Sequence, residues 1–160
     1  MSDGFSDGGE AACSASTFAG AGEPDDAALA RVVRELADAV VVVDADGVIV
    51  VWNSAATALF GWTALEAAGK TLELIVPTRL WARHAAGFAR VMATGHTDYG
   101  SRLLEVPALR KDGTTMSIAF TVTLLRHPEH RLPHGIAAVI RDDTENREAK
   151  RALHHRRVTD

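Results

Sequence analysis

The stretch Val43-Asp-Ala-Asp-Gly-Val-Ile-Val-Val-Trp-Asn53 decides the fold. β-Branched residues run up to Val43 and resume at Val48, and Asp46-Gly47 between them is a strong signal for a tight hairpin turn. The side chain of Asn53 is suited to cap the first turn of a helix. The sequence therefore predicts a β-hairpin that leads directly into a short helix.

The residues after Asn53 predict helices first and strands later. The short helix ends at Gly61, a second helical piece reaches Gly69, and Pro77 opens a longer helix that ends near Gly95. After Gly95 the apolar period changes to two, which is typical of strands. One predicted strand turns Arg102, Leu104, Val106 and Ala108 to the same side, and the next turns Met116, Ile118, Phe120, Val122 and Leu124 toward the core. The apolar run 136–140 predicts a fifth strand.

This order of elements predicts an α+β fold in one domain. We expect a five-stranded antiparallel sheet with short helices and one longer helix on one face. A flanking helix is expected over residues 25–38, capped by Asp25 or Asp26, and a charged connector helix with a tail over 144–160. These two outer helices could cover the other face. The central domain then spans 39–143, and residues 1–24, rich in Gly and Ser, are expected to be a disordered leader.

Composition excludes several classes of protein. The apolar fraction is 47% and the charged fraction 24%, and no apolar run reaches the length of a membrane span. The net charge of −4 argues against a nucleic-acid surface. Cys13 is the single cysteine, so an internal disulfide framework is excluded. Because a secretory signal is not recognisable, we expect a cytoplasmic protein that binds neither membranes nor nucleic acid.

Over residues 36–147 the chain resembles the PAS family. The resemblance rests on the opening hairpin with Asn53, on Phe60-Gly61-Trp62, on Arg110-Lys-Asp-Gly-Thr114 and on Val139-Ile-Arg-Asp-Asp-Thr-Glu145. The last motif usually carries Ile or Val where Asp143 stands. The resemblance implies a PAS fold in a sensor domain, expected here as a stand-alone module without an output domain. Function must then be argued from the pocket, because one fold serves many ligands.

One face of the longer predicted helix carries a histidine among apolar residues. Leu80, His84, Gly87, Phe88 and Val91 follow the three-and-four spacing of such a face. An imidazole on that face needs a hydrogen-bond partner or a metal, because an unsatisfied buried ring nitrogen is costly. A proximal histidine is a common ligand of heme iron. The pattern therefore makes His84 a candidate heme ligand, with a core histidine as the simpler alternative.

The segment from Arg83 to Gly113 also resembles the heme-binding PAS domains of oxygen-sensing kinases and phosphodiesterases. That resemblance implies heme b with His84 as axial ligand, Arg90 near a propionate, and Phe120 and Val122 in the distal wall. Leu104 stands where those sensors carry an oxygen-binding Arg, and Arg102 is a possible substitute. The implied heme site comprises His84, Leu80, Gly87, Phe88, Arg90, Val91, Arg102, Leu104, Met116, Ile118, Phe120 and Val122. The expected signal is a diatomic gas (CO, NO or O2) or redox state.

Other functions remain open. The main alternative is a non-heme interaction or dimerisation module whose pocket is empty or holds a small organic ligand. A photoreceptor of the flavin-adduct type is excluded because its reactive cysteine has no counterpart inside the domain, which leaves only a different flavin chemistry open. An enzyme, such as a peroxidase-like one, is not expected, since no acid–base pair surrounds the pocket. A metal site at His127, His130 and His134 fits no known spacing. We expect a homodimer that signals to an unknown downstream protein.

Overall fold

The computed structural model describes residues 25–100 and 102–158. The chain forms helix α1 (Asp26–Glu35), strands β1 (Ala39–Asp44) and β2 (Ile49–Trp52), helices α2 (Ser54–Phe60) and α3 (Ala64–Ala67), 3-10 turns η1 (Leu72–Leu74) and η2 (Thr78–Leu80), helix α4 (Trp81–Thr94), strands β3 (Leu104–Leu109), β4 (Thr115–Arg126) and β5 (Pro133–Asp142), and helix α5 (Thr144–Val158). The leader expected over 1–24 lies outside the described residues.

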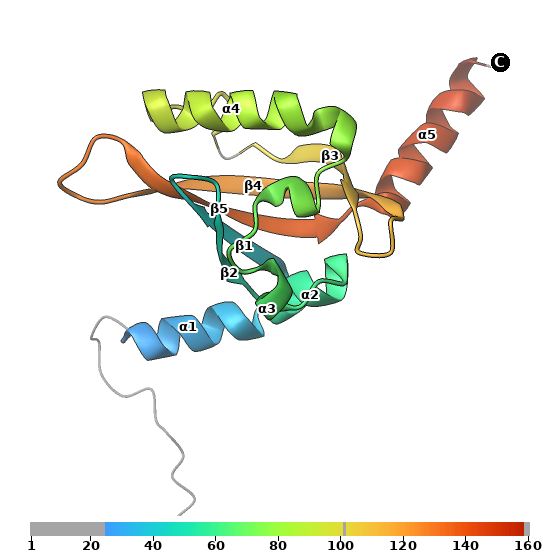
Figure 1. Cartoon of the computed structure of the whole chain (residues 1–160). Coiled ribbons are helices and arrows are strands. Elements are labelled where there is room, and N and C mark those ends of the chain that lie inside the picture. The colour runs from blue at the N-terminus through green and yellow to red at the C-terminus, as the bar shows by residue number, and fades with distance from the viewer. Residues whose placement is uncertain (1–24, 101, 159–160) are drawn as a thin grey trace, which may run out of the picture.

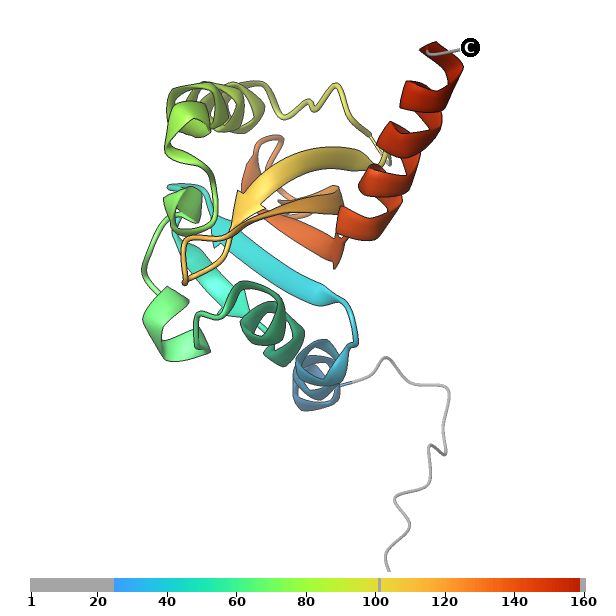
Figure 2. The same ribbon diagram turned by 90° about the vertical axis from the view of Figure 1, so that its right-hand side faces the viewer.

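The five strands form one antiparallel sheet in the order β2-β1-β5-β4-β3. Helix α4 crosses above β4 and β5 (Figure 1), α2 packs on β1, and the turned view shows both helices on the same side of the curved sheet (Figure 2). The expected α+β architecture, with the helical segment on one face, is therefore confirmed. The strand order brings β1, from the start of the domain, beside β5, which ends it.

The inner face of the sheet follows the predicted alternation. In β4 the residues of even number face the helices, and Met116 and Ile118 are buried at 3% and 4% exposure. Their cross-strand neighbours in β3 are Ala108 and Val106. Phe60 of α2 is fully buried against this face and its ring centroid lies 5.4 Å from that of Trp52. The closed part of the core thus lies under α2, toward the β1–β2 hairpin.

Asn53 does more than cap α2. Its side-chain oxygen accepts from the backbone N–H of Val40 at 2.9 Å and of Ala56 at 2.9 Å, and its amide nitrogen donates to the carbonyls of Val33 and Asp38 at 3.0 Å each. The side chain is 2% exposed, so these bonds are formed away from water. One residue therefore joins α1, β1 and α2.

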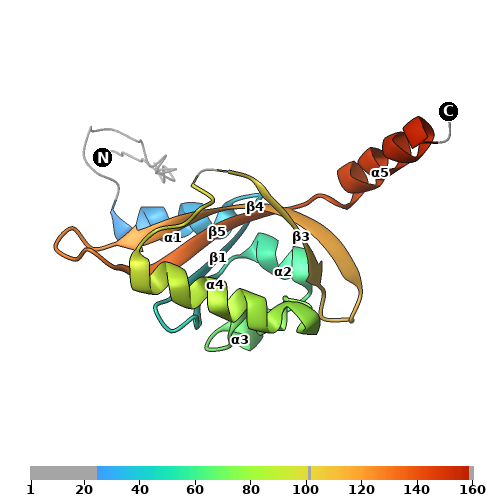
Figure 3. The ribbon, with the colours of Figure 1, turned by 90° about the horizontal axis from the view of Figure 1, so that it is seen from above.

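Both expected flanking helices are present, but they leave the outer face of the sheet uncovered. Helix α1 packs beside α2, and α5 contacts β4 at its base and then projects away from the domain (Figures 1 and 2). Seen from above, α5 extends well beyond the sheet (Figure 3). Val139, on the outer face of β5, accordingly remains 40% exposed. The charge of α5 explains this, since few apolar residues are available to pack on a sheet.

Two element boundaries differ from the prediction. The helix expected from Pro77 starts at Trp81, because residues Thr78–Leu80 after Pro77 form a 3-10 turn instead. The strand expected to include Arg102 starts at Leu104, because the N–H of Arg102 closes a turn onto the carbonyl of Tyr99 at 2.8 Å. Arg102 is exposed and does not belong to the inward face. Helix α4 ends at Gly95 as predicted, in the left-handed conformation.

Candidate ligand site

The space between α4 and the sheet is only partly filled by side chains. Of the 14 residues of α4, all within the described part of the chain, Val91 is the single buried one. Several apolar residues that face α4 from the sheet stay half-buried: Leu104, Val106, Phe120, Val122, Leu124, Ile136 and Ala138. Apolar side chains on an inner face are ordinarily buried. An apolar surface under α4 is therefore available to a ligand.

His84 lines a small pocket at the start of α4. The pocket has a volume of about 120 Å3 and is walled by the β1–β2 turn at Asp46 and Gly47, by η1 from Thr71 to Glu73, and by Trp81, Ala85 and Phe88 of α4. A β-carbon on Gly47 would lie 3.5 Å from the Phe88 ring, so the helix rests on the hairpin here. The pocket wall includes residues of neither β3 nor β4.

The electrostatic surroundings of His84 favour its neutral form. Although the side chain is exposed, neighbouring protein atoms partly desolvate the ring, and this lowers the pKa of His84 below its ordinary value. The carboxylate of Glu73 acts in the opposite direction and is the weaker influence. A neutral imidazole has a free nitrogen lone pair, which is the form that ligates a metal.

The other predicted site residues fall into two groups. Met116, Ile118, Phe120, Val122 and Leu104 all lie on the inner face of the sheet, and Leu104 is the direct partner of Phe120. Gly87, Phe88 and Val91 lie on α4 and are half-buried or buried, and half-buried Leu80 precedes the helix. The two groups face each other, but the pocket wall at His84 belongs to the helix and hairpin side alone.

The two arginines expected at the site are directed elsewhere. Arg90 forms an exposed ion pair with Asp98 at 2.8 Å. Arg102 lies in the turn before β3. Because exposed ion pairs contribute little stability, Arg90 is able to exchange Asp98 for another anion at small cost.

Heme fits this site in chemistry but needs more room than the pocket provides. In favour, His84 offers a neutral imidazole, the sheet offers an apolar face, and a β-carbon on Gly87 would meet nothing within 4 Å. Against, about 120 Å3 is below the range of about 300–1,000 Å3 that is usual for ligand sites. Heme would therefore require α4 to shift away from the sheet.

The histidines of the β4–β5 loop do not form a metal site. The rings of His127 and His130 lie 5.3 Å apart, and His127 accepts a bond from the N–H of Glu129 at 3.4 Å. Within residues 25–100 and 102–158, no group of three or more His, Cys, Asp or Glu side chains is placed to hold a metal ion.

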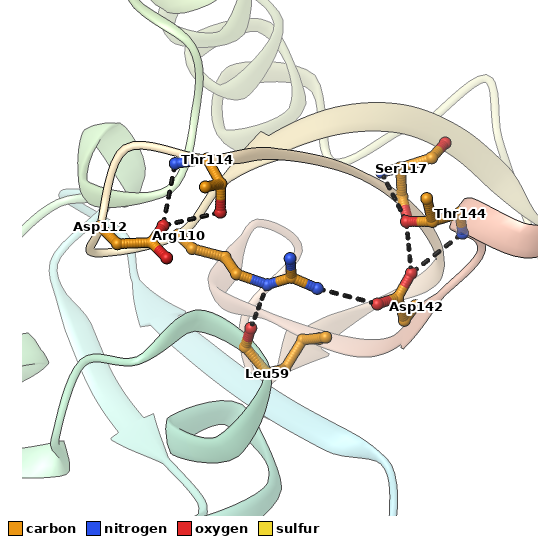
Figure 4. A network of polar contacts seen from close by, with 7 residues as sticks. All are labelled: Leu59, Arg110, Asp112, Thr114, Ser117, Asp142 and Thr144. Atoms are coloured by element: carbon orange, nitrogen blue, oxygen red, sulfur yellow. Dashed lines mark hydrogen bonds and ion pairs between the residues drawn. The ribbon is translucent and has the colours of Figure 1, made fainter.

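A polar network at the base of α5 connects several elements (Figure 4). The guanidinium of Arg110 donates to the carbonyl of Leu59 at 3.3 Å and to the carboxylate of Asp142 at 3.0 Å. The other oxygen of Asp142 accepts from the N–H and hydroxyl of Thr144 at 2.9 and 2.6 Å. The hydroxyl of Thr144 also accepts from the backbone N–H of Ser117 in β4 at 3.2 Å and lies 3.5 Å from the carbonyl oxygen of the same residue. A change in the sheet therefore has a direct polar route to α5.

One residue that sequence reasoning did not single out is Arg126 at the end of β4. Its guanidinium donates to the carbonyl of Gly95, which caps α4, and to the carbonyl of Arg131 at 2.8 Å. An arginine at a strand end gives no sequence signal for such a role.

Comparison with known proteins identifies the family. The family model for the PAS fold matches residues 27–142. The chain belongs to the PAS family. It is 40% identical over 124 residues to an uncharacterized protein of Azorhizobium caulinodans, covering 77% of this chain and 16% of that one. It is 30% identical over 94 residues to the sensor protein FixL of Bradyrhizobium diazoefficiens, and the match covers 59% of this chain and 19% of FixL.

The solved structures agree on the fold. A PAS domain from Colwellia psychrerythraea superimposes with a TM-score of 0.63 at 22% identity, covering 73% of this chain and 95% of that one. At such identity the likeness concerns the fold alone. The chain spans about a sixth to a fifth of the length of the two sequence relatives, which are longer proteins. None of the helices described here combines the length and apolar character that crossing a bilayer requires.

Proposed function

We propose that this PAS domain is a sensor module that binds heme b between α4 and the sheet, with His84 as the axial ligand. The observation that carries the proposal is the place of His84, which lines a pocket against the β1–β2 turn on a helix with one buried side chain. Its register matches the axial histidine of the heme-binding PAS domains that the segment resembles. The lowered pKa of His84 supports ligation, because a proton does not compete at neutral pH.

The residues around such a heme would have separate roles. The open side of Gly87 would admit the ring edge, Phe120 and Val122 would exclude water from the distal side, and Arg90 would meet a propionate by a charge-assisted bond. Heme iron would supply a coordination position for a diatomic gas or a change of redox state. Leu104 provides no hydrogen-bond donor, so the pocket favours CO, NO or redox sensing over stable binding of O2.

The proposed output runs through the base of α5. Leu104 lies on β3, which ends next to Arg110, and Phe120 lies on β4, which begins near Ser117. Arg110 bonds Asp142 and Ser117 bonds Thr144. A displacement of these strands by a ligand would therefore alter the contacts that orient α5. A downstream protein would read this change, and we propose a role in sensing rather than in catalysis.

We also propose that the module acts as a homodimer through α1. Leu29 and Val32 of α1 and Leu36 directly after it are 48%, 54% and 42% exposed. Helix α1 packs beside α2 but buries none of its own side chains there, so this apolar face is left for a packing partner. A second copy supplies the same apolar face under two-fold symmetry. Sedimentation of wild type and Val32→Glu tests this: the variant should be monomeric and the wild type dimeric.

A second candidate function is a non-heme PAS module for a small organic ligand. It is favoured by the volume of about 120 Å3 beside His84, which suits a molecule much smaller than heme. Addition of hemin to the purified protein separates the candidates. Heme ligation predicts a sharp Soret band that His84→Ala alters and His134→Ala, at an exposed histidine, leaves unchanged. An unchanged spectrum in His84→Ala contradicts the proposed ligand.

A further inference from the structure

Helix α4 is fixed to the rest of the domain chiefly at its two ends. At the C-terminal end, Arg126 donates to the carbonyls of Gly95 and Arg131. At the N-terminal end, the indole of Trp81 donates to the carbonyl of Val76 at 2.8 Å. Between these anchors, Val91 is the one buried side chain of the helix. Apart from half-buried Phe88, which rests against Gly47 of the hairpin and the core, the middle of α4 buries no side chain against the sheet.

The C-terminal anchor is the stronger of the two. Gly95 is buried at φ +69°, and a β-carbon there would lie 3.1 Å from a guanidinium nitrogen of Arg126. The carbonyls at a helix C-terminus carry partial negative charge, so a guanidinium forms charge-assisted bonds with them. The anchor at Trp81 is a single bond from a neutral group that is 37% exposed.

We propose that Arg126 is a latch that fixes the C-terminal end of α4, so that the helix opens from the sheet at its His84 end. The half-buried apolar residues Phe120 and Val122 would become accessible by this motion. The inference deepens the proposed function, because α4 covers the ligand site proposed there and heme requires more room. It rests on contacts within the protein, however, and is tested without heme.

The test is amide hydrogen exchange of the full chain, followed by mass spectrometry, for wild type and Arg126→Met. Methionine keeps much of the aliphatic part of the side chain and removes the guanidinium group that donates the two hydrogen bonds. Arg131→Met is the matched control, because the backbone carbonyl of Arg131 accepts the bond while its side chain forms none of the contacts described. Arg126→Lys keeps the charge but loses the paired donors of the guanidinium. The exchange rate of residues 91–95 in this variant should therefore lie between those of wild type and Arg126→Met.

The latch predicts that residues 91–95 exchange about tenfold faster in Arg126→Met, which corresponds to about 1.4 kcal/mol. Strands β1 and β5 should keep their wild-type rates, and Arg131→Met should match wild type throughout. In wild type, residues 85–88 should exchange faster than residues 91–95. An increase below threefold in residues 91–95, an equal increase in β1 and β5, or the reverse order within α4 overturns the latch.

The result is separable from that of the heme experiment. If Arg126→Met loosens α4 but hemin gives no Soret band, the latch stands and the heme proposal fails. If hemin binds through His84 but α4 exchanges equally in all variants, heme binding stands and the latch fails.

Discussion

The guanidinium of Arg110 lies 3.0 Å from the carboxylate of Asp142 and thereby ties the end of β3 to the strand that leads into α5. Arg110 also bonds the last turn of α2 through the carbonyl of Leu59. Three segments far apart in the sequence therefore meet at one side chain, beside the point where α5 leaves the domain (Figure 4).

Replacing Arg110 with Met should lower the free energy of unfolding by about 1–2 kcal/mol. The partly exposed ion pair contributes less than about 1 kcal/mol, and the lost bond to Leu59 adds about as much again. Urea denaturation measures the change. Arg79→Met, at an exposed arginine in η2, is the control and should differ from wild type by no more than about 0.5 kcal/mol. Equal stability of the two variants would argue against a structural role for Arg110.

Asn53→Ala should be among the most destabilising substitutions in the domain, at about 3 kcal/mol or more. The change leaves the N–H groups of Val40 and Ala56 and two carbonyls without their partner in a buried setting. Asn53→Asp keeps both accepted bonds but turns a buried carboxylate oxygen toward the carbonyls of Val33 and Asp38, so it should also be strongly destabilising. Ser54→Ala, at an exposed neighbour, should be nearly neutral. A thermal melt in which Asn53→Ala behaves like Ser54→Ala would contradict this account.

Gly87→Ala should have opposite effects on stability and on heme binding. Alanine is favoured over glycine inside a helix by about 0.5–1 kcal/mol, and its β-carbon meets nothing within 4 Å. If the heme ring approaches α4 at Gly87, the added methyl should weaken hemin binding at least tenfold while the melting temperature rises. Ala86→Gly, at an exposed site one residue away, should lower stability and leave hemin affinity unchanged. Unaltered affinity in Gly87→Ala would place the heme elsewhere.

Acid should remove the contribution that the ionised side chain of Glu66 makes to the stability of the fold. The bond from Lys111 at 2.6 Å, helped by Thr63, lowers the pKa of Glu66 from 4.5 to about 2. A carboxyl whose pKa is lowered by folding stabilises the fold above its unfolded value near 4.5, and this contribution is lost as the pH falls through about 2. Wild type should therefore exceed Glu66→Gln in melting temperature at pH 7, by a margin that narrows between pH 4.5 and 2. A constant margin would show that Glu66 acts without its charge.

The sequence predicts the sheet better than it predicts the site. Alternation through β4 places Ile118 and Phe120 on the correct face, because a buried face enforces a period of two. The same alternation wrongly extends β3 back to Arg102, since side-chain pattern does not show that Tyr99 and Arg102 close a turn. Strand ends depend on backbone bonds that the pattern leaves open.

Long-range polar contacts explain the remaining differences. Asn53 is predictable as a cap because the bond to Ala56 is local, whereas its bonds to Val33 and Val40 depend on tertiary packing. Arg126 lies 31 residues from Gly95, so its role needs the fold to be known. The register of His84 on its helix is readable from sequence, but its position beside η1 and the hairpin is not.

The most direct test of the heme proposal is hemin binding by wild type, His84→Gly and His134→Gly, each measured with and without added imidazole. Wild type and His134→Gly should give the same Soret band, His84→Gly should lose it, and imidazole should restore it by supplying the missing ligand. Identical spectra for all three proteins without imidazole would show that His84 does not hold the iron and would contradict the account.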